Sequence, residues 1–151
     1  MGYTTTYTGT LFFKKEPTVE ILRELKRLEH ADARAKENRH WLADFPQADE
    51  VRYIAFRITD NLDGIEWNED EKFNEAIEAV NLITHRLRKI DPSFAFEGSL
   101  NAQGEDFDDR WVLEIDDQGW AVKRELKLIG DVVRCPHCDN KFMLTDEMKV
   151  K

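Results

Sequence analysis

The sequence has no apolar run that approaches the roughly 20 residues needed to cross a lipid bilayer. Its first residues also lack the basic segment followed by an apolar segment that marks a secretory signal peptide. These absences argue against a membrane protein and against export, and they predict a soluble cytoplasmic protein. At 151 residues, the chain is long enough to bury an apolar core as one domain.

The sequence also contains fewer basic than acidic residues. The chain has 22 lysines and arginines against 31 aspartates and glutamates, which gives a net charge of -9 at pH 7. Proteins that bind nucleic acids generally need a basic surface that neutralises phosphates. The charge balance therefore argues against direct nucleic-acid binding and favours a partner protein with a basic surface.

Several motifs of enzyme active sites are missing. The chain has no glycine-rich phosphate-binding loop, no Gly-x-Ser-x-Gly nucleophile elbow and no paired-histidine zinc protease motif. It also has no internal repeat and no low-complexity tract. The sequence therefore indicates none of these common enzyme classes, and we predict no catalytic residue.

The first half of the chain reads as strand, helix, strand and strand. Apolar residues alternate over 3–13 and again over 52–59, which predicts two strands. Between them, Thr18 is a good N-cap for a helix whose apolar residues recur at spacings of three and four. A turn after residue 59 leads to a short strand over 65–67.

The second half begins with a helix and continues with three strands. Asn68 followed by Glu71 forms a capping-box pattern, and an apolar stripe then runs to Ile90. The next three segments alternate between apolar and polar residues and predict an antiparallel meander over 94–101, 111–115 and 120–128. In the last of these strands, we expect the core face to carry Trp120, Val122, Leu126 and Leu128.

This order predicts an α+β fold, with two helices packed on one face of a mostly antiparallel sheet. The first six elements match the βαββαβ order of ferredoxin-like folds. We expect a single α+β domain over 1–130 and a C-terminal tail over 131–151.

Four short motifs stand out along the chain: Gly2-Tyr-Thr-Thr5, Gly64-Ile-Glu-Trp67, Glu71-Lys-Phe73 and Gln103-Gly-Glu-Asp106. As a set they resemble a family of small proteins from phages, prophages and some bacteria that has no established activity. The resemblance covers the N-terminal strand and roughly residues 62–115. It implies a phage or prophage setting and no particular site residues. The tail that carries the cysteines departs from the pattern of that family.

The most specific local motif is Cys135-Pro-His-Cys138, which contains both cysteines of the chain. Two cysteines at this spacing, with a β-type residue before them and an aromatic residue after them, are typical of a zinc knuckle. A closed zinc site needs four ligands. The remaining ligands must come from His137, another histidine, a carboxylate, a partner protein or a second copy of the chain in a homodimer. We therefore predict a structural zinc site with Cys135, Cys138 and His137 as candidate ligands.

The same four residues permit a redox interpretation. Cys-Pro-His-Cys is also the active-site sequence of the periplasmic disulfide oxidases, where it opens a helix in a thioredoxin fold. Only residues 139–151 follow the motif, and they are too few to complete that fold. A thiol–disulfide oxidoreductase therefore stays an alternative to the zinc site, as does a motif with free thiols or a local disulfide.

Acidic residues gather in and beside the predicted meander. We predict a negative face that docks on a basic protein. An alternative is a hard-cation site at Asp106, Asp108 and Asp109, although the loop lacks the ligand periodicity of a known calcium loop. A solvated charged surface without a binding role also fits the pattern. The candidate protein-binding residues are Glu97, Glu105, Asp106, Asp108, Asp109, Asp116 and Asp117.

A weaker pattern lies at Glu125-Leu-Lys127, with Asp116 or Asp117 upstream. By letter it resembles the acid and Glu-x-Lys of metal-dependent nucleases, in which carboxylates hold a magnesium ion and the lysine steadies the attacking water. Glu-x-Lys is common on any solvated strand face, so a metal-dependent nuclease stays an alternative.

Together, the charge, the cysteine motif and the missing catalytic motifs favour a small acidic protein that binds another protein. A host-directed or anti-defence inhibitor fits this description by analogy. A structural component of a virion is a further alternative.

Overall fold

The computed structural model describes residues 4–29, 54–69, 73–106, 108–126, 132–134 and 141–143. Within them the chain forms two helices and a seven-stranded antiparallel sheet, which confirms the α+β class. Neither of these helices is long and apolar enough to cross a membrane. The elements are β1 (Thr6–Thr8), β2 (Leu11–Phe13), α1 (Val19–Glu29), β3 (Phe56–Ile58), β4 (Gly64–Trp67), α3 (Ala76–Leu87), β5 (Phe96–Gln103), β6 (Arg110–Ile115), β7 (Ala121–Glu125), β8 (Val132–Arg134) and β9 (Lys141–Met143).

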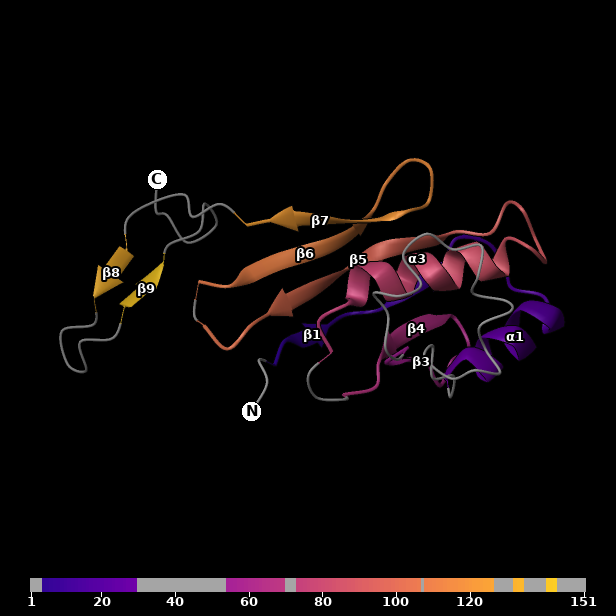
Figure 1. Cartoon of the computed structure of the whole chain (residues 1–151), viewed down its shortest axis with the longest axis horizontal. Helices are drawn as coiled ribbons and strands as arrows, with labels where there is room; N and C mark the ends of the chain where they lie inside the picture. The colour runs from indigo at the N-terminus through magenta and orange to yellow at the C-terminus, as the bar shows by residue number, and fades with distance from the viewer. Residues whose placement is uncertain are drawn as a thin grey trace.

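The large sheet has the strand order β3-β4-β2-β5-β6-β7, with β1 also paired to β5 (Figure 1). Helix α1 connects β2 to β3, and α3 connects β4 to β5. Each helix therefore links two strands that have one other strand between them, which is the interleaved arrangement of a ferredoxin-like fold. Strands β6 and β7 extend this sheet as the predicted meander.

The N-terminal strand is interrupted where the sequence predicts one continuous strand. Gly9 has a φ of +111° and divides β1 from β2. Tyr7 pairs with Ala102 and Leu11 pairs with Gly98, so one register with β5 continues through the interruption. The predicted alternation therefore survives, and Tyr7 and Leu11 are both buried.

Both helices cover the same face of the sheet, as predicted (Figure 1). The Thr18 hydroxyl accepts a hydrogen bond from the Ile21 N–H at 3.2 Å, which is the expected N-cap of α1. Arg86 of α3 forms an ion pair with Glu24 of α1 at 2.9 Å. The opposite face is exposed and largely polar, as at Glu97. One face of the sheet thus builds the core and the other meets solvent.

The predicted N-cap of the second helix at Asn68 is wrong, because α3 begins at Ala76. The carbonyl of fully buried Phe73 accepts a hydrogen bond from the Tyr7 hydroxyl at 2.9 Å. The Asn74 side chain accepts another from the Thr5 hydroxyl at 2.8 Å. These contacts tie the residues before α3 to the N-terminal strand, so the helix begins about two turns after the local capping signal.

The predicted core face of β7 is wrong at Val122 and Leu126. Ala121 pairs with Ile115 of β6, whose side chain lies on the core side. Ala121 and the other odd-numbered residues of β7 therefore lie on the helix side of the sheet. Val122 and Leu126, the residue after β7, lie on the opposite face and are each 39 % exposed. Val122 and Leu126 therefore face away from the core, and Leu128 lies outside the described residues.

Close packing of α3 explains this orientation of β7. The Asn81 side chain of α3 accepts a hydrogen bond from the Ala121 N–H at 2.7 Å and donates one to the Ala121 carbonyl at 3.2 Å. Two such bonds bring the helix against the strand, and Ala121 is almost fully buried there. A small residue suits this position better than Trp120 or Val122 would.

Strands β8 and β9 form a separate two-stranded antiparallel sheet. Val133 pairs with Phe142, and Arg134 pairs with Lys141. The cysteine motif belongs to the connection between these two strands, and Cys135, His137 and Cys138 lie outside the described residues.

Candidate protein-binding surface

The β5–β6 connection holds four of the seven predicted binding residues, and we call Glu105, Asp106, Asp108 and Asp109 the acidic loop. The Gly104 N–H donates to the Asp109 carbonyl at 2.8 Å, which closes the loop across its base. The Gln103 side-chain amide donates to the carbonyls of Gly104 and Asp106, both at 3.0 Å. The loop backbone is therefore held in shape by its own hydrogen bonds.

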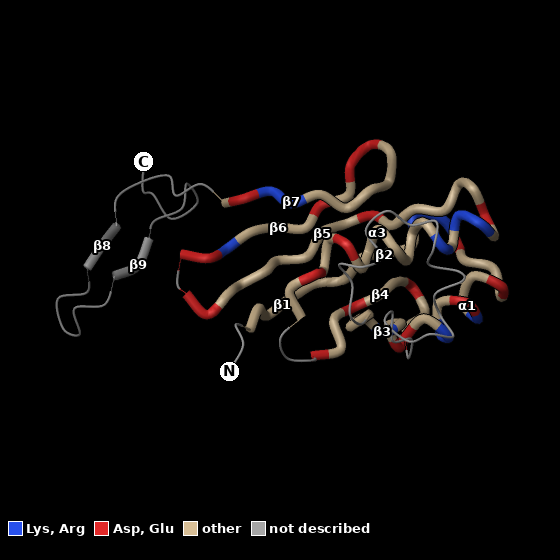
Figure 2. The backbone as a smooth tube through the Cα atoms, in the orientation of Figure 1, with Lys and Arg blue, Asp and Glu red and all other residues tan. Residues whose placement is uncertain are grey.

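The carboxylates of the acidic loop lie on the outside of this frame. Glu105, Asp106 and Asp108 are exposed, and Asp109 is half-buried. Glu105 accepts a hydrogen bond from the Thr4 N–H at 2.8 Å, which joins the loop to the start of β1. Figure 2 shows the described carboxylates of the loop as two red segments at the end of the β5–β6 hairpin. The arrangement presents several negative charges on a defined backbone.

Two further carboxylates act on the same part of the core as Asp109. Burial raises the pKa of Tyr7 above its ordinary range, and the negative charges of Glu75, Glu78 and Asp109 raise it further. Glu75 and Glu78 lie at the start of α3 and are half-buried. The negative field around Tyr7 therefore comes from both the helix start and the acidic loop.

The other three predicted binding residues lie elsewhere. Asp116 and Asp117 occupy the β6–β7 turn, which the six residues of β6 separate from the acidic loop by about 20 Å. The Asp116 carboxylate accepts hydrogen bonds from the N–H groups of Gln118 and Trp120, both at 2.9 Å, so it shapes the turn. Glu97 lies in the half of β5 nearer that turn, paired with β2. The seven residues thus do not form one continuous surface.

The metal-binding alternatives are not supported by the geometry of the described residues. Among them, no group of three or more His, Cys, Asp or Glu side chains could hold a metal ion, the acidic loop included. For the nuclease pattern, β7 pairs Glu125 with Trp111, at the end of the β6–β7 hairpin far from Asp116. Lys127 lies outside the described residues.

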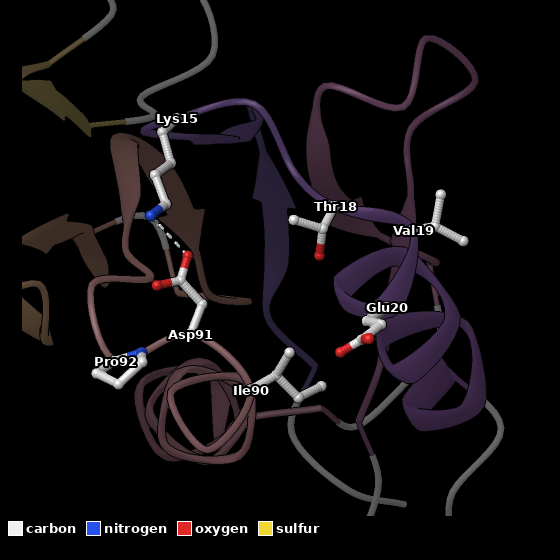
Figure 3. A pocket seen from close by; sticks show the side chains of 7 residues that line it. All are labelled: Lys15, Thr18, Val19, Glu20, Ile90, Asp91 and Pro92. Carbon is white, nitrogen blue, oxygen red and sulfur yellow. Dashed lines mark ion pairs between the residues drawn. The ribbon is translucent and has the colours of Figure 1, made fainter.

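The structure also contains a shallow hollow that the sequence analysis does not anticipate (Figure 3). It has a volume of about 530 Å³ and lies between the start of α1 and the end of α3. The Lys15 and Asp91 side chains point toward one another and form an ion pair at 2.7 Å. It is lined by Lys15, Thr18, Val19, Glu20, Ile90, Asp91 and Pro92.

The ion pair beside this hollow makes a prediction about titration. Hydrogen bonds from Lys15 and Ser93 lower the pKa of Asp91 from 3.8 to about 2. Because the folded-state pKa is depressed, the stabilising contribution of Asp91 is present above pH 3.8 and is lost as the pH falls toward 2. We expect Lys15→Ala to raise the Asp91 pKa toward its ordinary value in an NMR titration of the side-chain carboxyl signals. An unchanged Asp91 pKa in this variant would contradict the role of Lys15.

Comparison of the chain with protein-family models, with curated proteins and with solved structures finds no significant match. The resemblance to phage and prophage proteins therefore stays a prediction. The surface of the chain is then what indicates a function, and the acidic loop holds four of the seven predicted binding residues in one place.

Proposed function

We propose that this chain acts by binding another protein through the acidic loop, and that the partner has a basic surface. The observation that carries the proposal is the closed loop backbone, which displays Glu105, Asp106 and Asp108 to solvent. A loop that is already held by internal hydrogen bonds loses little conformational freedom on binding. Its clustered charges also steer a basic partner toward it and disfavour acidic ones.

The charge of the whole chain supports this choice of partner. The net charge of -9 attracts a basic protein over a distance comparable to the Debye length, which is about 8 Å at physiological salt. Glu75 and Glu78 add to the negative field near the acidic loop. The association rate should therefore fall as salt is added, which is typical of electrostatically steered complexes.

The resemblance to phage and prophage proteins suggests the setting in which such a partner is found. In our proposal the partner is a host protein, and the chain inhibits it or diverts it from its function. This step is an analogy and rests on the four short motifs. The choice of a basic partner rests on the acidic loop and on the net charge of the chain, and it is tested separately.

Affinity capture from a cell lysate tests the proposal. The loop variant carries Glu105→Gln, Asp106→Asn and Asp108→Asn, which remove charge with little change in side-chain shape. The control variant removes the same charge from exposed positions outside the seven predicted binding residues, by Glu16→Gln, Glu20→Gln and Asp60→Asn. We expect the wild-type chain and the control variant to retain the same basic protein. The loop variant should retain at least about tenfold less.

Two outcomes of the capture would contradict the proposal. The first is that the wild-type chain retains no specific protein. The second is that the loop variant and the control variant retain the same partner equally well, because the position of the charges would then be irrelevant.

We also propose a structural zinc ion in the β8–β9 hairpin. Its support is that the two paired strands bracket both cysteines of the chain, and a shared zinc ion would hold these two cysteines together. Protein purified without chelator should contain about one zinc per chain, or about half a zinc per chain if two chains share a four-cysteine site. The double variant Cys135→Ser, Cys138→Ser should contain none. Wild-type protein with free thiols and no metal would contradict the prediction.

A further inference from the structure

Strand β7 lies at one edge of the large sheet, and its backbone groups point alternately toward β6 and away from it. The N–H of Leu126 donates to the Arg110 carbonyl at 3.4 Å, so the backbone N–H and carbonyl groups of the even-numbered residues point toward β6. The N–H and carbonyl of Ala121 point away from β6 and bind the Asn81 side chain. The odd-numbered residues of β7 therefore offer their backbone groups to the outside.

Beyond Ala121, this outer edge has no strand beside it among the residues that the structure describes. Among the described residues, the outward backbone groups of Lys123 and Glu125 have no hydrogen-bond partner. At the other edge of the sheet, the outward N–H of Ile58 in β3 donates to the Glu29 carboxylate at 2.5 Å. One edge is thus covered by a side chain of α1, whereas the outer half of β7 is left available for another strand.

The side chains of this edge complement a second copy of themselves. Lys123 and Glu125 lie on the helix side, carry opposite charges and approach each other to 3.7 Å. Val122 and Leu126 lie on the open face and are each 39 % exposed. The segment therefore has one charged pair and one apolar pair, and in each pair the two residues lie symmetrically on either side of Arg124.

We propose that β7 pairs with β7 of a second copy of this chain, antiparallel and centred on Arg124. Lys123 then lies opposite Glu125 of the partner subunit, and Val122 lies opposite Leu126 of the partner subunit. The backbone groups of Lys123 and Glu125 both point outward. Each Lys123–Glu125 pair across the two-fold axis therefore forms two backbone hydrogen bonds. The pairing continues the sheet across the two-fold axis and covers the exposed apolar residues.

Neighbouring registers are less favourable. A pairing centred on Lys123 would place two lysines opposite each other, and one centred on Glu125 would place two glutamates opposite each other. In the proposed register only Arg124 faces its own copy, and its guanidinium already forms an ion pair with Glu114 at 2.6 Å. Charge complementarity therefore selects the register centred on Arg124.

Charge reversal tests the pairing. The single variants Lys123→Glu and Glu125→Lys each place like charges opposite each other twice, so each should weaken self-association at least about tenfold. The double variant Lys123→Glu, Glu125→Lys restores opposite charges and should recover it. An equimolar mixture of the two single variants should form heterodimers. Sedimentation equilibrium of the full chain measures all four, and circular dichroism checks that each is folded.

The interface is smaller than that of a typical stable dimer, so concentrations up to about 1 mM are needed. Each measurement is made with chelator and with added zinc, because the cysteine motif offers a separate route to a dimer. Lys123→Pro is a second variant, since it removes an outward N–H and leaves the bonds to β6 intact, and it should also weaken self-association at least about tenfold.

Three results would overturn the proposal. They are a wild-type chain that stays monomeric over the whole concentration range, a double variant that associates as weakly as the single variants, and a dimer that chelator abolishes and charge reversal leaves unchanged. The proposed pairing uses no residue of the acidic loop, so it stands or falls independently of the proposed function.

Discussion

Replacing Gly64 with alanine is expected to lower the free energy of unfolding by at least about 3 kcal/mol. A Cβ atom at this position would overlap the carbonyl oxygen of Leu11 and approach the Cα of Phe12 to 2.9 Å. Both contacts are with backbone, which cannot move aside as the end of a side chain can. Because β4 lies between β3 and β2, a shift of either backbone would disturb the ladders on both sides.

Chemical denaturation of Gly64→Ala measures this loss. Glu66→Ala is the matched control, since it lies on the same strand and the same face of the sheet. Its side chain forms only a partly exposed ion pair with Arg57 at 3.0 Å, so the control should lose less than about 1 kcal/mol. Equal losses of unfolding free energy in the two variants would contradict the prediction, because the close approach of β2 would then not be the reason that position 64 requires glycine.

Replacing Phe73 with alanine is expected to lower the free energy of unfolding by about 3–5 kcal/mol. The Phe73 ring is fully buried, with its centroid 5.4 Å from that of Phe56 and 5.7 Å from that of Tyr7. Removal of the ring leaves a cavity. It also loosens the segment before α3, in which the Phe73 carbonyl accepts a hydrogen bond from the Tyr7 hydroxyl. The effect is therefore large even though Phe73 lies outside every helix and strand.

Phe12→Ala is the matched control for this prediction. Phe12 lies on the open face of the sheet and is 43 % exposed, so its truncation removes less buried area. We expect a loss below about 1.5 kcal/mol in the same denaturation experiment. A loss from Phe12→Ala as large as that from Phe73→Ala would contradict the assignment of the core to the helix side of the sheet.

The parts of the fold that the sequence predicts correctly are those that local patterns determine. The N-cap at Thr18 is set by residues within one turn of it. The alternation of Tyr7, Leu11 and Phe13 survives the interruption at Gly9, because the register with β5 is unchanged. The order of the elements then restricts the topology to a few arrangements, of which the ferredoxin-like one is observed.

The errors arise where a distant contact overrides a local pattern. Asn68 and Glu71 have the pattern of a helix cap. The hydrogen bond from Tyr7 to the Phe73 carbonyl holds this segment against the N-terminal strand, and α3 begins only at Ala76. The apolar residues of β7 suggest a core face at Val122, but the hydrogen bonds of Asn81 to Ala121 turn the other face toward the helix. Neither partner lies near its target in the sequence, so a local pattern contains no signal of either contact.

The acidic surface shows the same limit. Glu105 and Asp109 lie in one loop and are found together, whereas Asp116 is only seven positions beyond Asp109 and lies at the opposite end of β6. A strand carries the chain away by about 3.3 Å per residue, so neighbours in sequence become distant in space. Conversely, Glu75 is far from Asp109 in sequence and acts on the same core residue, Tyr7.

The central claim is that the acidic loop binds a basic partner protein. Its most direct test is the affinity of the captured partner for the wild-type chain, the loop variant and the control variant at several salt concentrations. We predict that added salt weakens wild-type and control binding alike. The loop variant should bind at least about tenfold more weakly at low salt and respond less to salt. Equal affinities for all three proteins, or an affinity indifferent to salt, would contradict the claim.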